Sequence, residues 1–376
     1  MKKILITGGA GFIGSRLTEE LYQKGYRITI LDNLSSQIHG SRENSLSYHR
    51  VKKISNFIIG DVRNKDDWKL ALKDNDIIVH LASLTGTGQS MYEIDEYNAV
   101  NVMGTSHLLS SLMDSEHQVK KIIIASSRSV YGEGKYKCID HGTQFPDKRL
   151  EVDMKNGEFN NKCLECRKTI DPIPTDETAR INPSSIYAIT KYQQESMIML
   201  MADYLNIPSV ILRYQNVYGP GQSLINPYTG ILSVFSTRLL NGINIEVYED
   251  GLESRDFIYI DDVVRSTILS IEKDECNGEI LNIGSGSPVT VNEVAKLLKN
   301  LYNSQSKITI NGKYRLGDIR HNFADISKAN KLLGFYPETS FEQGIKNFAD
   351  WVQNQDIYED NYEKSLKELD EKGFIK

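Results

Sequence analysis

The chain opens with a short apolar run, a glycine-rich turn and a helical pattern, in that order. The apolar run covers residues 3–7, and the turn carries Gly8, Gly11 and Gly14. Glycines at this spacing allow a tight turn, let the backbone approach a pyrophosphate and bring the helix close to the strand, so that the first helical amides face the phosphates. The helical pattern continues over residues 12–24. This combination predicts a βαβ unit that binds a dinucleotide.

An acidic residue follows the second predicted strand, which covers residues 27–31. A carboxylate in the place of Asp32 accepts hydrogen bonds from ribose hydroxyls and repels a 2′-phosphate. The sequence therefore favours NAD over NADP. Asp61 and Val62 follow a third strand, and Asp61 is interpreted either as a contact to the adenine edge or as the cap of the next helix. Both alternatives stay open at this point.

Strand-like and helical segments alternate through the first half of the chain and return later in it. Predicted strands cover residues 3–7, 27–31, 57–60, 77–81, 121–125, 209–213 and 279–283, and predicted helices cover 12–24, 66–73, 184–204, 261–272 and 291–301. Such alternation is typical of a parallel sheet built from βαβ units, and nearly continuous apolar runs such as 122–125 fit strands that are covered on both faces. We predict an α/β fold with a doubly wound parallel sheet.

The predicted sheet divides the chain into two parts. Residues 1–213 are expected to form a dinucleotide-binding domain, interrupted at 133–176 by a polar insertion that contains cysteines. Residues 214–376 are expected to form mainly a smaller C-terminal substrate domain, with 244–283 returning to the first domain. The tail at 356–376 is charged and spaces its apolar residues like a helix.

The charge of the chain argues against two classes of partner. Lysine and arginine total 44 and aspartate and glutamate total 50, which gives a formal net charge of −6. Nucleic acid and anionic membranes attract basic proteins, so neither is expected as the main partner. No apolar run approaches the length of about 20 residues that crosses a bilayer, and the apolar start is too short for a signal peptide. We expect a cytoplasmic protein that acts on a small molecule.

A tyrosine and a lysine are one helical turn apart in the helix predicted at 184–204. Tyr187 and Lys191 therefore share a helix face. A free phenol keeps its proton up to a pKa of about 10, and a nearby ammonium and a nicotinamide cation favour the phenolate, which makes this tyrosine a candidate general base. Ser127 follows the strand at 121–125 and can hold a substrate hydroxyl or carbonyl beside it. Without this context, the pair would indicate only a solvated helix face.

Together these motifs resemble the extended short-chain dehydrogenases/reductases, in the branch that epimerises nucleotide-linked sugars. The matching segments run nearly from end to end: Gly8–Gly14, Asp32–Asn33, Asp61–Val62, His80–Ala82, Asn101 with Gly104–Thr105, Ser126–Gly132, Tyr187–Lys191, Arg213 with Asn216–Pro220, Arg255–Phe257 and Arg315–Asp325. The resemblance implies a Rossmann fold, an NAD cofactor and transient oxidation of the sugar. It also implies a homodimer, formed through the helix with Tyr187 and the one near Val100–Met113.

The resemblance implies roles for individual residues as well. Ser127, Tyr187 and Lys191 resemble the catalytic triad. The expected cofactor contacts are Gly8, Gly11, Phe12, Ile13, Gly14, Asp32, Asn33, Asp61, Val62, Leu81, Ala82, Asn101, Tyr187 and Lys191. The expected substrate contacts are Thr85, Gln89, Ser90, Arg128, Asn216, Arg255 and Arg315. Arg255 and Arg315 are expected to clamp the diphosphate by forked hydrogen bonds, and the alternative for either is a surface ion pair.

Two departures from related enzymes narrow the expected chemistry. The 4,6-dehydratases carry an Asp–Glu pair where this chain has Arg128 and Ser129, so dehydration is not expected. UDP-galactose 4-epimerases carry a lysine where this chain has Thr85, which argues against the galactose/glucose substrate pair. Segments 88–93 and 127–134, the cysteine insertion and the charged tail are similar to the dTDP-L-rhamnose 4-epimerases.

The expected reaction is therefore inversion at C4 of a 6-deoxyhexose nucleotide, dTDP-L-rhamnose to dTDP-6-deoxy-L-talose. One alternative is a 4-epimerase of UDP-hexoses or UDP-N-acetylhexosamines, and another is a net reductase of a keto-sugar nucleotide. A third alternative is an NAD-binding regulator without catalysis, against which the complete Ser127, Tyr187 and Lys191 set argues.

Four residues of the insertion form two close pairs. Cys138 and His141 are separated by two residues, as are Cys163 and Cys166. Pairs with this spacing suit a tetrahedral, structural Zn²⁺, which would stabilise a segment too polar to form its own core. The alternatives are a redox-sensitive thiol cluster and no joint role. Cys276 has no partner in the sequence and is interpreted as structural.

Overall fold

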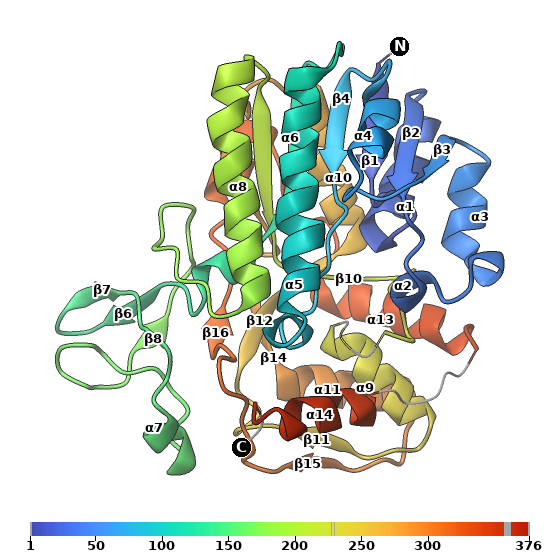
Figure 1. Ribbon diagram of the computed structural model, residues 1–376. Helices are drawn as coiled ribbons and strands as arrows, with labels where there is room; N and C mark the ends of the chain where they lie inside the picture. Colours follow the sequence, from blue (N-terminus) through green and yellow to red (C-terminus); the bar gives the residue numbers. More distant parts are fainter. Residues whose placement is uncertain (1, 227, 229, 357–361, 375–376) are drawn as a thin grey trace.

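The computed structural model describes residues 2–226, 228, 230–356 and 362–374. A seven-stranded sheet in the order β13-β9-β5-β4-β1-β2-β3 lies at its centre (Figure 1). All of its strand pairs are parallel. The strands are β1 (Lys3–Thr7), β2 (Arg27–Asp32), β3 (Asn56–Ile59), β4 (Ile77–His80), β5 (Lys121–Ser127), β9 (Ser209–Tyr214) and β13 (Ile280–Ile283). The predicted doubly wound α/β fold is confirmed, and each predicted strand lies within two residues of the observed one.

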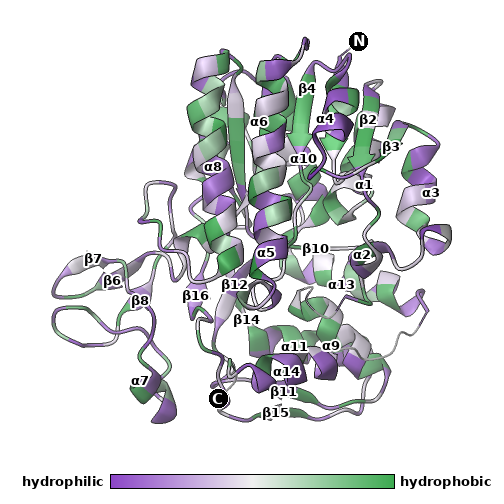
Figure 2. Cartoon of the chain, in the orientation of Figure 1, coloured by the Kyte–Doolittle hydropathy of each residue, from purple (hydrophilic) through white to green (hydrophobic). Residues whose placement is uncertain are grey.

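Alternation along the strands separates the apolar side chains into two cores. Ile4 and Ile6 belong to one core, whereas Leu5 between them belongs to the other. The first core is covered by α1 (Phe12–Gln23), α3 (Leu46–Lys52) and α10 (Ile260–Glu272), and the second by α4 (Lys65–Leu72), α6 (Gly104–Asp114) and α8 (Ile186–Leu205). Hydrophobic colour concentrates on the central strands in Figure 2. Strands that are buried on both faces explain the continuous apolar runs of the sequence.

The direction of the strand order reverses between β1 and β4, and the carboxyl ends of these strands face the lower half of the molecule in Figure 1. Ligands of doubly wound sheets bind at such a reversal. Short elements connect the strands there: α2 (Ser36–His39), α5 (Ile94–Tyr97), a π-helical turn (Asn98–Met103) and 3₁₀ turns at Arg42–Asn44, Gln89–Met91 and Arg128–Tyr131. The site is therefore built mainly from loops at this edge.

Smaller sheets and helices lie below the same edge (Figure 1). One small sheet contains β10 (Asn216–Tyr218), β12 (Ser254–Tyr259), β14 (Pro288–Thr290) and β16 (His321–Asn322), and another pairs β11 (Ile245–Val247) with β15 (Ile308–Ile310). The helices are α9 (Ile231–Leu240), α11 (Val291–Leu301), α13 (Phe341–Gln353) and α14 (Tyr362–Glu371), whereas α12 (Ser327–Leu333) lies beside β13 and α10 of the large sheet. Within 244–283, α10 and β13 lie with the large sheet and β11 and β12 with the small ones; the division into domains stays a prediction.

The cysteine-containing insertion projects from the body as a separate lobe (Figure 1). It contains β6 (Tyr136–Cys138), β7 (Gly142–Gln144), α7 (Glu151–Lys155) and β8 (Asp171–Pro172), and β6 pairs with both other strands. The apolar cluster around the cysteines is small and consists of Tyr136, Cys138, Cys163 and Ile170, with Cys166 against it, and a second small cluster joins Met154 and Phe159 to Tyr314. So little apolar burial cannot by itself offset the entropy of ordering a lobe of this length.

The charged tail forms a helix, as predicted, over the part of it that is described. α14 buries Leu369 and exposes most of its charged side chains. Residues 357–361 and 375–376 of the predicted tail lie outside the described residues. Among the described helices, none is both long and apolar enough to cross a membrane.

Candidate active site

The glycine-rich turn brings the backbone of β1 and α1 into close contact. Gly8 has a φ of +69°, which glycine adopts without strain. A Cβ on Gly14 would lie 2.2 Å from the carbonyl oxygen of Gly8. Gly11 caps α1 without a side chain, and the amides of Phe12, Ile13 and Gly14 donate to no group of the described chain. The turn therefore presents open amides at a helix N-terminus, which fits the pyrophosphate of a dinucleotide.

Asp32 holds this turn against the end of β2. Its carboxylate accepts from the amide of Ala10 at 2.9 Å and from the amide of Leu34 at 2.9 Å. Asn33 donates to Asp61 at 2.9 Å, so the ends of β2 and β3 are joined. The predicted acid thus lies beside the glycine turn, where ribose hydroxyls would lie if a dinucleotide occupied it.

Asp61 is a fixed anion at the edge of this region. Burial raises the pKa of its carboxyl, but hydrogen bonds from Arg63 and Asn33 outweigh burial and lower the pKa to about 2. The cap of α4 is Asn64, which accepts from the amide of Asp66 at 3.0 Å. The interpretation of Asp61 as the helix cap is therefore wrong, and its contact with adenine stays a prediction. Val62 is buried against Gly104.

The catalytic candidates meet where α8 passes the end of β5. Lys191 is buried and donates from Nζ to the carbonyl of Ala125 at 2.8 Å. Ser127 accepts at Oγ from the amide of Ser129 at 3.2 Å. Tyr187 lies one turn before Lys191 and bonds with Ser127. Three residues that the sequence separates by 64 positions thus lie together, as the difference between 191 and 127 shows.

Burial dominates the electrostatics of this group. Burial raises the pKa of Tyr187, and the groups that oppose it are Ser127 and Arg128 rather than Lys191. The physical reason is that the Lys191 ammonium is directed to Ala125 O and Gln194 Oε1. Burial lowers the pKa of Lys191 to about 7, with Glu195 opposing the change. In the protein alone, Ser127 and Arg128 therefore oppose the effect of burial, and the lowering of the tyrosine pKa by Lys191 together with a bound nicotinamide cation stays a prediction.

Three other predicted contacts are occupied within the protein. Asn101 lies fully buried in the π-helical turn and bonds both backbone groups of Leu84, accepting from its amide at 2.9 Å and donating to its carbonyl at 3.1 Å. Ser90 accepts from the amide of Tyr187 at 3.0 Å. Gln89 is bonded to Gln37 and to Tyr97. These side chains hold the loop after β4, which presents Thr85 to solvent and begins with Leu81 and Ala82.

An open cleft lies beside Ser127. Its lining comes from five parts of the chain: Thr87, Gly88, Met91, Arg128, Ser129, Gly132, Ser184, Ser185, Arg315, Leu316, Gly317, Asp318, Ile319, Leu369 and Phe374. Sequence reasoning missed Leu369 and Phe374 of the tail. Its helical spacing was the only available signal, and spacing does not say what an apolar face contacts.

The three predicted arginines are not equivalent. Arg255 donates to the carbonyls of Ser254, Ile319 and Arg320 at 2.8–3.1 Å, so it braces the loop that carries the cleft residues. Arg315 donates to Tyr362 Oη, and its buried Nε has no partner among the described residues. Arg128 donates from Nε to Asn216 at 3.1 Å, and neither terminal nitrogen bonds to the described chain. Arg128 and Arg315 therefore keep donors for an anionic ligand.

The charged form of Arg128 is also destabilised by its surroundings in the protein alone. Burial and the charge of Arg255 lower the pKa of its guanidinium to about 9. A guanidinium that is buried beside another cation is stabilised by an incoming anion. The cleft is therefore prepared for a negatively charged group such as a diphosphate.

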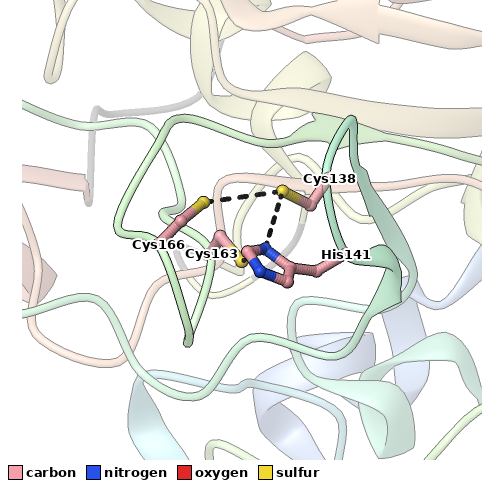
Figure 3. Close-up of side chains that lie close together, drawn as sticks. All are labelled: Cys138, His141, Cys163 and Cys166. Carbon is pink, nitrogen blue, oxygen red and sulfur yellow. Dashed lines mark hydrogen bonds between the residues drawn. The ribbon is translucent and has the colours of Figure 1, made fainter.

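The insertion brings its four candidate ligands together (Figure 3). The side-chain atoms of Cys138, His141, Cys163 and Cys166 all lie within 4.8 Å of one another. The Sγ atoms of Cys138 and Cys166 are 3.7 Å apart, and His141 Nδ1 lies 3.6 Å from Cys138 Sγ and 3.5 Å from Cys163 Sγ. Zinc bond lengths in a tetrahedron give sulfur–sulfur and sulfur–nitrogen edges of about 3.8 and about 3.6 Å. The donor set and its spacing fit that geometry.

A buried ionic network joins the base of the lobe to the loop at 315–320. Arg149 donates to both carboxylate oxygens of Glu249 at 2.8 Å and to the carbonyl of Asp318 at 2.9 Å. Glu133 accepts from the amide of Arg320 at 2.8 Å. The lobe and the cleft are therefore mechanically connected.

A family model described as the NAD dependent epimerase/dehydratase family matches residues 4–150 and 167–284. The chain belongs to this family. The matched ranges include the glycine turn, Asp32, Ser127, Tyr187 and Lys191, whereas the unmatched gap holds Cys163 and Cys166. Family membership confirms the predicted extended short-chain dehydrogenase/reductase class and the prediction of an NAD-dependent enzyme.

Individual members of the epimerase/dehydratase family are similar over almost the whole chain. A dTDP-L-rhamnose 4-epimerase of Burkholderia thailandensis is 35% identical over 94% of this chain and 96% of that protein. The crystal structure of a UDP-glucose 4-epimerase of Thermotoga maritima with UDP-glucose has a TM-score of 0.75 and 30% identity, covering 93% of this chain and 98% of that one. A UDP-glucuronic acid 4-epimerase of Bacillus cereus in complex with UDP-glucuronic acid and NAD has a TM-score of 0.75 and 26% identity, covering 93% and 99%.

Replacement of Gly14 with alanine tests the pyrophosphate site. The added Cβ would meet Gly8 O at 2.2 Å. Overpacking costs about 1–3 kcal/mol, so the affinity for NAD should fall by about tenfold or more, measured by titration of the purified protein. In the control Gly88→Ala, the new Cβ would lie 3.6 Å from Leu369, an ordinary contact. Wild-type NAD affinity in Gly14→Ala would contradict the assignment.

Proposed function

We propose that this protein is an NAD-dependent 4-epimerase of a nucleotide-linked sugar, with dTDP-L-rhamnose and dTDP-6-deoxy-L-talose as its substrate pair. The observation that carries the proposal is the meeting of Ser127, Tyr187 and Lys191 at the carboxyl edge of the sheet, between the glycine turn and an arginine-lined cleft. The similarity to a dTDP-L-rhamnose 4-epimerase supports the choice of sugar.

Residues at the carboxyl edge fit NAD as the cofactor. The open amides of Phe12, Ile13 and Gly14 would hold its pyrophosphate, and Asp32 would accept from its ribose. NAD, when bound, supplies a reversible hydride acceptor, which is the chemistry that a tyrosine and a serine cannot provide themselves.

Side chains of the protein transfer and hold the proton of the sugar hydroxyl. Tyr187 Oη, as the phenolate, accepts the proton of the sugar hydroxyl at C4 and returns it after the ring has turned its other face. Ser127 Oγ, which is bonded to Tyr187, positions the sugar oxygen. Arg128 and Arg315 would bind the diphosphate, so that the oxidised sugar stays tethered while it turns. Lys191 is buried and Tyr187 is partly buried, so the transfer takes place largely away from bulk water.

The identity of the sugar rests on small differences in the site. Arg128 and Ser129 stand where a dehydratase needs an acid and a base, so a 6-deoxygenated sugar must arrive already made. Thr85 is exposed and stands where UDP-galactose 4-epimerases carry a lysine near the nicotinamide, whereas Gly86 is buried against Tyr97 and Tyr228. A second candidate is a UDP-sugar 4-epimerase, which the likeness to the UDP-glucose 4-epimerase supports.

A substrate panel distinguishes these candidates. dTDP-L-rhamnose, UDP-glucose and UDP-N-acetylglucosamine should each be incubated with the purified protein and read by NMR at equilibrium. We expect conversion of dTDP-L-rhamnose with no net change in NADH absorbance, because hydride is returned within each cycle. Conversion of the UDP-sugars alone would refute the proposed identity of the sugar, and net consumption of the cofactor would refute the proposal that the enzyme is an epimerase.

Replacement of Tyr187 with phenylalanine tests the base. The ring remains, so the fold and NAD binding should persist, while turnover should fall by about 10²- to 10⁴-fold, the range of general acid–base groups. Tyr192→Phe is the matched control, because Tyr192 lies on the same helix and is 40% exposed. Steady-state rates of both variants decide the assignment, and a fast Tyr187→Phe enzyme would refute it.

The ligand geometry supports a further part of the proposal, a structural zinc ion held by Cys138, His141, Cys163 and Cys166. Three thiolates and an imidazole are a typical closed zinc set. His141 Nε2 lies 3.7 Å from Glu165, and a carboxylate in that place orients a ligating imidazole. The ion would supply the stability that the small apolar cluster of the lobe lacks.

Elemental analysis tests the zinc site. Purified protein should contain about one zinc per chain. Combined replacement of Cys163 and Cys166 with serine should remove it and make residues 133–176 sensitive to protease, because the pairs no longer close the lobe. Cys276→Ser should keep its zinc, since Cys276 is buried away from the lobe against Lys121. Metal-free wild-type protein with a protease-resistant lobe would disprove the idea.

We also propose a homodimer formed through α6 and α8. The exposed apolar side chains of this region are Met103, Met113, Ile189, Tyr192, Leu200 and Tyr204. Exposed apolar patches of this kind mark interfaces. Sedimentation equilibrium should give the mass of two chains for the wild type and of one chain for Leu200→Glu with Tyr204→Glu. A monomeric wild type would exclude the dimer.

A further inference from the structure

A chain of buried polar side chains runs from Lys191 to the centre of the sheet. Lys191 Nζ donates to Gln194 Oε1 at 2.9 Å, and Gln194 Nε2 donates to Thr105 Oγ1 at 2.6 Å. Thr105 Oγ1 lies 3.2 Å from His80 Nε2, and His80 Nδ1 lies 2.7 Å from Thr7 Oγ1. All five residues are buried, with Gln194, Thr105 and Thr7 fully so. The chain links the catalytic helix to β4 and β1 without contacting the cleft.

The donors and acceptors of this chain admit one arrangement. The single hydroxyl proton of Thr105 is donated to the carbonyl of Asn101 at 2.7 Å. Thr105 can therefore only accept from its other neighbours, so both His80 Nε2 and Gln194 Nε2 must donate to it. Thr7 Oγ1 accepts from the amide of Ala82 and so gives its own proton to His80 Nδ1. The amide of Gln194 is thereby locked with its oxygen toward Lys191.

His80 is consistent with this arrangement because it is neutral. Burial and the charge of Lys191 together lower the pKa of its imidazole to about 3. A neutral imidazole donates through one nitrogen and accepts through the other, as the chain requires. A protonated imidazole would instead repel Lys191 and would reverse the bond with Thr7, whose hydroxyl proton would then lose its acceptor.

We propose that Gln194 is a positioning residue of the reaction. Its amide oxygen keeps the buried Lys191 ammonium charged and fixes the direction of that ammonium, while Thr105 and His80 lock the orientation of the Gln194 amide. The ammonium has two acceptors in the described chain, the carbonyl of Ala125 and the amide oxygen of Gln194. Both are neutral, and only Gln194 can be changed by substitution. The proposal rests on the proposed function for its catalytic meaning, but the state of Lys191 can be measured without substrate.

Other charged groups around Lys191 are accounted for. On the same helix, Glu195 is paired with Arg213 of β9, with nitrogen–oxygen distances of 2.6 and 2.9 Å, and burial raises the pKa of Tyr187. From β4, only His80 faces the lysine, and it is neutral. From α6, the group in the chain is Thr105, which does not ionise. Gln194 is therefore the point at which a substitution acts on the lysine directly.

Two substitutions of Gln194 should move the titration of Lys191 in opposite directions. Gln194→Met removes the acceptor and leaves the ammonium less stabilised, so the pKa of Lys191 should fall by roughly one pH unit, the value of a hydrogen bond to a charged group. Gln194→Glu places a carboxylate against the ammonium, so that pKa should rise by about 1 to 3 pH units. Gln193→Met and Gln193→Glu are matched controls on the exposed side of the helix, and they should leave the pKa of Lys191 unchanged.

NMR of protein labelled at lysine Cε measures these titrations in the absence of substrate, with the Lys191 signal assigned by its loss in Lys191→Met. If turnover requires the charged lysine, the basic limb of the kcat–pH profile should move to lower pH in Gln194→Met and to higher pH in Gln194→Glu, with KM little changed. Equal titrations in the wild type and both Gln194 variants would overturn the proposal, as would shifts of the same sign. The expected NMR shifts in a protein that converts no sugar nucleotide would uphold this role of Gln194 and reject the proposed function.

Discussion

The buried ion pair between Glu195 and Arg213 fixes the catalytic helix to the sheet. Arg213 donates from Nε and Nη2 to the two carboxylate oxygens of Glu195, and the same carboxylate bonds Ser126 at the end of β5. Arg213 also donates to Tyr131 at 2.8 Å, which extends the pair to the 3₁₀ turn after Ser127. Both charges are withdrawn from water, and removal of one partner from such a pair costs about 3–5 kcal/mol. Ser127, Tyr187 and Lys191 keep their mutual positions because this pair holds both of their elements, β5 and α8, against β9.

The parts of the site that sequence could predict depend on local backbone physics. The glycine turn is required because a side chain at Gly14 has no space against Gly8. Asp32 lies beside it because parallel strands bring their carboxyl ends to one edge. Tyr187 and Lys191 share a face because helical spacing alone dictates it. In each case a few neighbouring residues determine the geometry, so the pattern suffices.

The parts that sequence could not predict depend on which residues meet across the fold. Arg255 matches the family pattern, yet its guanidinium is engaged by the carbonyls of Ser254, Ile319 and Arg320. The side chain of Asn101 is likewise engaged in hydrogen bonds with the backbone of Leu84, because the π-helical turn directs it inward. The helical pattern of the tail did not indicate that Leu369 would line the cleft. The sequence could not decide whether Asp61 or Asn64 is the N-cap of α4, since both residue types suit that position.

The strand order has a consequence for how the chain is made. Five neighbouring strands, β3, β2, β1, β4 and β5, are complete once Ser127 has left the ribosome, and β9 joins them at Ser209–Tyr214. The last strand of this sheet, β13, begins only at Ile280, after β10, β11, β12 and α10 have been synthesised. Until then the outer edge of β9 presents unpaired backbone groups between apolar faces. That edge is where incomplete chains are most exposed to pairing with one another, and synthesis of residues 215–279 sets how long the exposure lasts.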